Sequence, residues 1–203
     1  IAAWSSGRVL FHWAAPGYLM LFPLLGAEVA RRLDQVVVRR LLAGTVAFVA
    51  AGVIVVGSAV QFDWLHPVIA QFSRKDPVIE AVDWTSLRAD LTRRGLLHAG
   101  TVVGVPNWRD AGKVAYALGP DVTTVCLNRD ARQFAFSAPA AMHIGQTVLI
   151  LAPEHAERVP AVLGSAFGRI EALPPSPILH AGRVMRQVAV FRGQDLRAWP
   201  PPG

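Results

Sequence analysis

Three polar side chains stand where an α/β domain would hold a ligand. Arg109 follows the apolar run 101–105, and Arg132 and Gln133 follow the run 122–127. Ligands of open α/β sheets bind outside the carboxyl ends of the strands, and a guanidinium or an amide there can contact a glycan or a phosphate. The alternative, which is commoner for such arginines, is a structural salt bridge or a hydrogen bond to a carbonyl group.

Standard catalytic motifs are mostly absent. The turn VPNWRD after the run 101–105 lacks G-x-G-x-x-G, so it cannot hold a pyrophosphate as dinucleotide-binding folds do. GSAFG at 164–168 is not the G-x-S-x-G of a nucleophile elbow. The acidic residues of the second half are scattered, and no carboxylate pair can be picked out. The motifs alone therefore indicate no active site.

The sequence also shows no metal-binding pattern. The four histidines of residues 83–203 do not have the spacing of metal ligands, and we expect surface or capping positions for them: His98, His143, His155 and His180. Cys126 is the only cysteine, so neither an intrachain disulfide nor a thiolate zinc cluster can form. We expect no cofactor in this chain, and a divalent metal is left open. Residues 61–203 carry 15 basic and 12 acidic side chains, and this modest excess of +3 is spread without a Lys/Arg block, so we expect no nucleic-acid partner.

The elements that would position these side chains begin with an apolar stretch, Leu41–Val60. It contains no charged, Asn, Gln or His side chain. At about 1.5 Å per residue it would span about 30 Å as a helix, the thickness of the hydrocarbon core of a bilayer. A buried core helix would carry a more polar face. We predict a transmembrane helix over 41–60.

A second apolar run, 9–27, is interrupted by Pro16, Gly17 and Pro23. Such residues are tolerated in a membrane helix when neighbouring helices satisfy the backbone, so we predict a second transmembrane helix; the alternative is a hydrophobic hairpin on a soluble domain. The connection 28–40 holds four arginines, namely Arg31, Arg32, Arg39 and Arg40. By the positive-inside rule this connection is cytoplasmic, and everything after Val60 then lies outside. Residues 61–82 are predicted to form an interfacial segment and a linker.

Residues 83–203 have the pattern of an α/β domain with a mostly parallel sheet covered by helices. Asn107 is the predicted N-cap of the helix WRDAGKVAYAL, which Gly119 and Pro120 end. The other predicted elements are helices at 85–94 and 154–164, strands at 101–105, 122–127, 146–151, 170–173 and 186–191, and a turn at 174–177.

Two stretches resemble a known family. The first is HWAAPGY at 12–18; the second is NWRDAGKVAYALG at 107–119, followed by VCL at 125–127 and RQF at 132–134. Both resemble the late membrane helix and the extracytoplasmic pattern of bacterial family-39 glycosyltransferases, which are related to protein O-mannosyltransferases and aminoarabinose transferases. Gly112 and Lys113 depart from the usual Ala-Glu of that pattern.

The resemblance implies a multi-pass cell-membrane enzyme that moves a sugar from a polyprenyl-phosphate donor to a protein, lipid or glycan acceptor on the outer face. The catalytic acidic residues of the family lie in an early outer loop that no part of this chain matches, so no catalytic residue is assigned here. The chain is expected to be the C-terminal part of a longer protein. His12 and Trp13 would then line the donor or acceptor cavity, or else serve as an interfacial anchor.

Two other functions compete with this interpretation. A non-catalytic, membrane-anchored extracytoplasmic binding module would show the same two apolar runs and the same α/β domain. A soluble nucleotide-binding protein is disfavoured by the apolar stretch 41–60 and by the missing phosphate loop. A start codon near Ile1 would support the module, and further membrane helices encoded upstream would support the enzyme.

Overall fold

The computed structural model describes residues 15–67 and 82–199 of the chain. The chain divides into two compact units, Ile1–Ser58 and Ala59–Gly203. His12 and Trp13 lie outside the described residues.

The first unit contains two short helices where one membrane helix over 9–27 was predicted. Helix α1 (Ala15–Leu19) stops, and helix α2 (Phe22–Arg31) begins after a turn at Met20 and Leu21. Pro23 lies at the start of α2 and explains the break, because proline has no backbone N–H and its ring clashes with the carbonyl four residues earlier. The prediction of one continuous helix is therefore wrong over its described part, and residues 9–14 lie outside the description.

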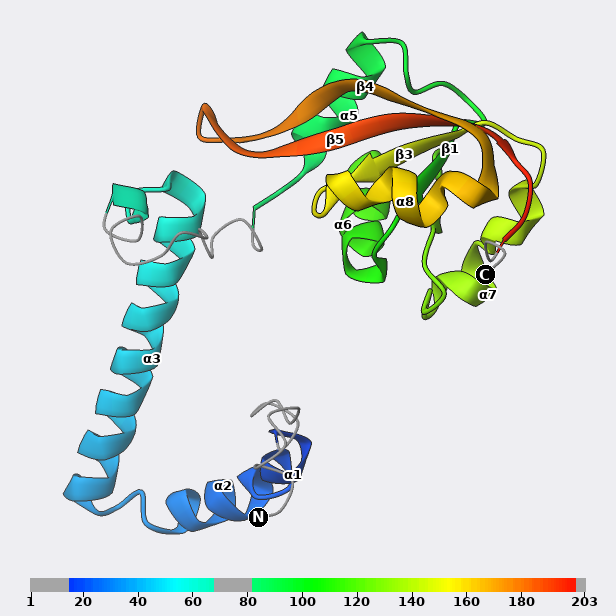
Figure 1. Ribbon diagram of the computed structural model, residues 1–203. Helices are drawn as coiled ribbons and strands as arrows, with labels where there is room; N and C mark the ends of the chain where they lie inside the picture. Colours follow the sequence, from blue (N-terminus) through cyan, green and yellow to red (C-terminus); the bar gives the residue numbers. More distant parts are fainter. Residues whose placement is uncertain (1–14, 68–81, 200–203) are drawn as a thin grey trace. The chain divides into compact units, whose positions relative to one another are not determined.

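The predicted helix over 41–60 is present and longer than expected. Helix α3 (Val36–Phe62) has 27 residues, and its most apolar window has a mean hydropathy of 2.2 with none of its residues buried (Figure 1). It is the one helix in the described part of the chain that is long and apolar enough to cross a membrane, judged by length and composition. A second membrane helix is not found there.

The arginine-rich connection is shorter than predicted. Arg31 ends α2, and Arg39 and Arg40 lie inside the first turns of α3, so only 32–35 are outside helices. Glu28 forms ion pairs with both Arg31 and Arg32. All these side chains sit before the apolar part of α3, where the positive-inside rule counts them.

The second unit is a mixed α/β domain built on a five-stranded sheet with the strand order β2-β1-β3-β5-β4 (Figure 1). Strand β1 pairs in parallel with β2 and β3, whereas β5 pairs antiparallel with β3 and β4. The strands span Val102–Val105 (β1), Thr123–Cys126 (β2), Val148–Ala152 (β3), Phe167–His180 (β4) and Arg183–Leu196 (β5).

The sheet therefore departs from the mostly parallel one predicted, because its last two strands form a long hairpin. The predicted turn at 174–177 lies inside β4 instead of ending a short strand. Prolines are tolerated there because β4 is an edge strand, and the register shifts between Leu173 and Ser176. Ala181 and Gly182 have positive φ angles and form the tight turn that makes β4 and β5 antiparallel neighbours.

Helices cover the sheet as predicted near the start of the domain and differ near its middle. Helices α5 (Thr85–Arg93) and α6 (Trp108–Leu118) match the predicted segments. The predicted helix over 154–164 is replaced by three short pieces; Pro160 stands in the first turn of the middle one, where a helix tolerates a proline. The short elements are α7 (Phe134–Ser137), η4 (Ala140–His143), η5 (Ala156–Arg158), α8 (Val159–Leu163) and η6 (Gly164–Ala166).

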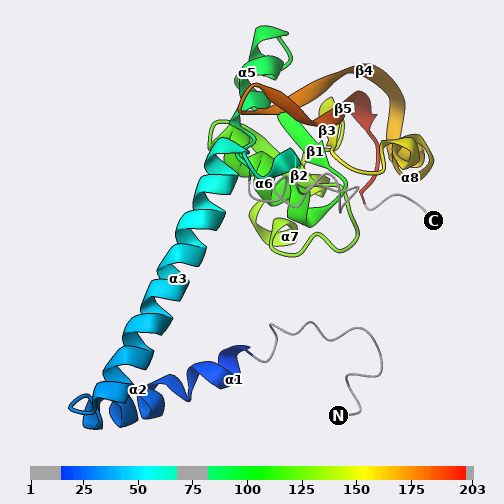
Figure 2. The same ribbon diagram turned by 90° about the vertical axis from the view of Figure 1, so that its left-hand side faces the viewer.

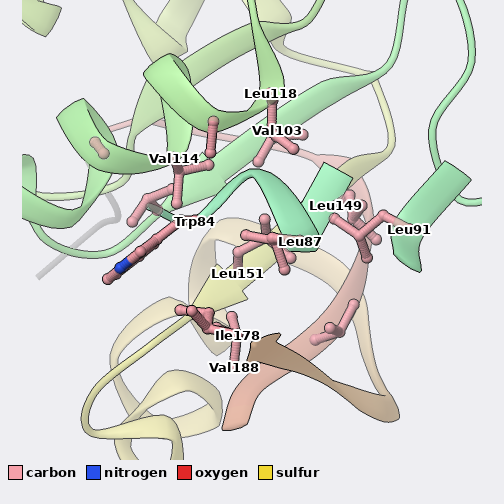
Figure 3. Close-up of a cluster of buried hydrophobic side chains, with 14 of the residues drawn as sticks. Trp84, Leu87, Leu91, Val103, Val114, Leu118, Leu149, Leu151, Ile178 and Val188 are labelled. Carbon is pink, nitrogen blue, oxygen red and sulfur yellow. The ribbon is translucent and has the colours of Figure 1, made fainter. Parts of the chain in front are cut away.

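Two apolar clusters lie on the two faces of the sheet. Alternate residues of β3 serve the two clusters: Leu149 and Leu151 join the side chains of α5 and α6, and Val148 and Ile150 join those of α8. Figure 3 shows the first cluster, and the two ribbon views show the helices arranged around the sheet (Figure 1, Figure 2). A sheet buried on both faces leaves its strand ends and loops as the places for a ligand.

The start of the second unit is tied to the tip of the β4–β5 hairpin. The Arg183 guanidinium donates to Asp63 Oδ2 at 2.7 and 2.9 Å, and His180 Nε2 lies 2.6 Å from the carbonyl oxygen of Val60. Asp63 ends α3 with a positive φ of 55°, and its side chain is only 9 % exposed. Trp64, which lies in the segment 61–82 predicted to be interfacial, is half exposed, and residues 68–81 lie outside the description.

Candidate functional site

A hollow opens at the carboxyl ends of the three parallel strands, and we call it the strand-end hollow. Its volume is about 240 Å³. The loops after β1, β2 and β3 line it together with the first turn of α6 and with α8. The lining residues are Pro106, Asn107, Asp110, Asn128, Pro153, Glu154, His155, Arg158, Val159, Val162 and Leu163. This is the edge at which ligands bind in open α/β sheets.

Two asparagines fix the shape of the hollow. Asn107 caps α6, because its Oδ1 accepts a hydrogen bond of 3.0 Å from the backbone N–H of Arg109. Asn128 follows β2 and donates from Nδ2 to the carbonyl oxygen of Pro106 at 2.9 Å, while its Oδ1 accepts from the N–H of Asp130 at 2.9 Å. The loops after β1 and β2 are therefore held together by side chain to backbone bonds.

The charged side chains of the hollow come from α6 and from the segment after β3. Asp110 lies in the first turn of α6 and is 8 % exposed, a position where the helix dipole stabilises a carboxylate. Glu154 faces Arg186 of β5 at 3.5 Å. His155 and Arg158 are exposed, and His155 has a left-handed backbone with φ of 54°. The hollow thus offers hydrogen-bond donors and acceptors of both charges.

None of the three residues singled out from the sequence of this domain lines the strand-end hollow. Arg132 stacks on the Trp108 ring, with its guanidinium carbon 5.3 Å from the ring centroid, and pairs with Asp130 at 3.1 Å. The Gln133 side chain is exposed, while its carbonyl oxygen accepts bonds from the first turn of α7. Arg132 therefore has the structural contacts that the alternative interpretation expects.

Arg109 is separated from the other two predicted residues. Its backbone is held by the cap of α6, and its side chain lines a different hollow, on the side of α6 that faces Trp84. The structure does not bring Arg109, Arg132 and Gln133 together in one site.

The one cysteine of the chain, Cys126, is not among the residues that line the strand-end hollow. Cys126 is buried at the end of β2, and burial raises its pKa to about 11, so the thiol stays protonated at neutral pH. In residues 15–67 and 82–199, no group of three or more His, Cys, Asp or Glu side chains is arranged to hold a metal ion.

The sequence directed attention to the sheet edge where this hollow lies, but Arg109, Arg132 and Gln133 are not among the residues that line it. Asn107 was predicted only as a cap, and His155 as a surface or capping residue. Asn128, Glu154 and His155 stand within three residues of the end of a parallel strand. Taking the first polar residue after each predicted strand would have found Asn107, Asn128 and Glu154.

No protein-family model, curated protein or solved structure matches this chain.

Proposed function

We propose that this chain is the C-terminal part of an integral-membrane glycosyltransferase, in which the α/β domain binds the sugar acceptor at the strand-end hollow. The observation that supports this best is the hollow itself: polar side chains from the loops after three adjacent parallel strands surround one small space. The resemblance of residues 12–18 and 107–134 to family-39 enzymes supplies the reaction class.

The polar groups of the hollow suit a saccharide. Sugar hydroxyl groups both donate and accept, so they match amides, carboxylates and guanidinium groups at once. Asn107, Asn128 and Glu154 are each held by a bond to the protein, which preorganises their remaining polar atoms. The volume of about 240 Å³ is below the roughly 300–1,000 Å³ of sites for drug-sized ligands. A single sugar ring at the end of an acceptor is a ligand of that scale.

The membrane part of the proposal rests on α3. As a membrane span it would run from the arginine-rich segment on the cytoplasmic side to Phe62 on the outer side. The donor would be a polyprenyl-phosphate sugar, with membrane lipid around α3 and a protein, lipid or glycan acceptor outside. A multi-pass enzyme needs further membrane helices, which would be encoded upstream of Ile1.

The experiment is to determine the coding sequence upstream of Ile1 and to assay the encoded protein in membranes. Transfer of a labelled sugar from a polyprenyl-phosphate donor supports the proposal, and an intact protein in the membrane without transfer contradicts it. In the same assay His12→Ala and Trp13→Ala at normal expression test whether these residues line the substrate cavity. Unchanged transfer by both variants would leave them the role of an interfacial anchor.

A non-catalytic, membrane-anchored binding module is the second candidate. It is favoured by the bonds of the polar groups in the hollow: Asn107 caps a helix, Asn128 ties two loops and Glu154 faces Arg186. Such groups suit recognition, and none of them is paired as a nucleophile with a base. A start codon near Ile1 together with glycan binding and no transfer would favour the module.

A further inference from the structure

A second hollow lies on the side of α6 that faces Trp84, and we call it the Trp84 hollow. Its volume is about 630 Å³, and it is separate from the strand-end hollow, with which it shares no lining residue. Arg109, Gly112, Lys113 and Tyr116 line it from successive turns of α6, at the spacing of one helix face. Trp84 and its neighbours line the opposite wall.

The charge of this hollow is positive. Arg109 and Lys113 bring two cations, and Asp83 brings one carboxylate, which leaves a net of +1. Both oxygens of Asp83 already accept hydrogen bonds of 2.8 Å from Thr85, at the start of α5. Among the described residues none forms an ion pair with Arg109, whose side chain is exposed. A guanidinium in this position is available to a phosphate or a carboxylate.

The wall of the hollow also contains a buried donor without an acceptor. Trp84 is only 2 % exposed, and its Nε1 has no hydrogen-bond partner. Figure 3 shows the indole nitrogen on the side of the ring away from the other labelled side chains of the apolar cluster. Buried indole N–H groups usually have a partner, because leaving one unpaired costs free energy. A ligand oxygen would supply the missing acceptor.

Lys113 and Tyr116 complete the hollow. The Lys113 ammonium lies 5.2 Å from the centroid of the Trp84 ring, a cation–π contact that an anion in the hollow would compete with. The Tyr116 side chain is 83 % exposed, so its ring is accessible to a ligand. An exposed aromatic face beside two cations suits the apolar face of a sugar ring that carries an anionic group.

We propose that the Trp84 hollow binds a phosphorylated saccharide. Arg109 and Lys113 hold the phosphate, the ring lies against Tyr116, and Lys113 moves from the Trp84 ring toward the phosphate so that a ligand oxygen reaches the indole N–H. This site goes beyond the proposed function, because it is separate from the acceptor hollow and is defined by binding alone.

Binding is measured on the full 203-residue chain in detergent micelles through the indole N–H signals of its six tryptophans. Trp84→Phe identifies the Trp84 signal. Glucose 1-phosphate is the probe, and glucose and inorganic phosphate are the two comparison ligands. The expected result is a saturable shift of the Trp84 signal with glucose 1-phosphate and a clearly weaker response to either comparison ligand. Equal binding of inorganic phosphate or of glucose would overturn the assignment of a phosphorylated sugar.

Two variants place the binding in this hollow. Arg109→Ala should weaken binding about tenfold or more, as expected for one charge-assisted contact. Gly112→Leu should abolish it by filling the hollow while the fold stays intact, because a Cβ at Gly112 meets no atom within 4 Å. Arg169→Ala, an exposed arginine on β4, is the matched control and should bind as wild type. An unmoved Trp84 signal, or equal affinity in Gly112→Leu and wild type, would overturn the proposal.

Discussion

Replacing Asp90 should loosen helix α5 from the edge strand of the sheet. The Asp90 carboxylate is 13 % exposed and accepts hydrogen bonds from Ser176 Oγ at 2.5 Å and from Arg94 at 3.3 Å. Arg94 also donates to the carbonyl oxygen of Pro174 at 2.7 Å, and Ser176 is fully buried within β4. This network therefore joins α5 to β4 through charged and buried groups. Because Trp84 directly precedes α5, the same network positions the wall of the Trp84 hollow.

The size of the effect follows from the contacts. Hydrogen bonds to a charged group contribute about 1.5–3 kcal/mol each, and Asp90→Asn keeps the shape but removes the charge. We expect a loss of about 2 kcal/mol in the free energy of unfolding, or roughly 4–8 °C in the melting temperature of a domain of this size. Arg93→Ala is the control: its side chain is 72 % exposed, so its pair with Asp90 should be worth less than about 1 kcal/mol.

The pH dependence of the stability difference between wild type and Asp90→Asn is a second test of this prediction. Burial alone would raise the pKa of Asp90, but hydrogen bonds from Ser176, Arg93 and Arg94 outweigh it and leave the pKa below the ordinary value of 3.8. A carboxyl with a lowered folded-state pKa contributes stability above its unfolded pKa and loses it as the pH falls through the folded one. The difference between wild type and Asp90→Asn should be constant above about pH 5 and shrink below about pH 4.

The assay is thermal unfolding of the full chain in detergent micelles, followed by near-ultraviolet circular dichroism between neutral pH and pH 3. Equal melting temperatures for Asp90→Asn and wild type at neutral pH would refute the reasoning. So would a difference that grows as the pH falls, since the sign of the linkage would then be reversed.

Three further experiments test the fold of the domain that contains the two hollows. Gly104→Ala should destabilise the domain by about 1–3 kcal/mol in denaturant unfolding, because the added Cβ would lie 2.4 Å from Leu127 Cδ1. Gly112→Ala, in open space on α6, should instead stabilise it by about 0.5–1 kcal/mol. A Gly104→Ala variant more stable than Gly112→Ala would contradict the packing. Asn107→Ala should cost about 1 kcal/mol by removing the cap of α6, whereas Asn107→Ser should retain most of it; equal loss in both would argue against capping. Cys126 should react with iodoacetamide at pH 8 only after unfolding, since burial raises its pKa to about 11, and rapid labelling of the native chain would contradict its buried position.

Local sequence signals predicted the helix whose two ends are marked by residues typical of helix termini. Asn107 marks the start of α6 and Gly119 its end, and both lie where the sequence places them. The long hairpin was missed because PPSP at 174–177 is typical of a turn, and only the position of β4 at the sheet edge allows prolines there. A pattern along one strand does not reveal whether that strand is at an edge.

The candidate site was predicted as a place but not as a set of residues. The rule for strand ends pointed to the edge of the sheet where the strand-end hollow lies, yet Arg132 turns to the Trp108 ring and Arg109 lines the Trp84 hollow. Where a side chain points after a strand depends on the loop backbone, and two positions in these loops, Arg132 and His155, have positive φ angles that ordinary residues seldom adopt. Periodicity carries no information about such turns.

The central claim is that the strand-end hollow binds the sugar acceptor of a membrane glycosyltransferase. The most direct test is the KM for the acceptor in transfer by the protein encoded with its upstream sequence, measured in membranes. Arg158→Ala removes an exposed guanidinium of the hollow, and His155→Asn removes the imidazole while keeping a residue that tolerates the left-handed backbone. Each should raise the KM about tenfold with little change in kcat, the signature of lost binding, while Arg169→Ala should leave both unchanged. An unaltered acceptor KM in both hollow variants would contradict the claim.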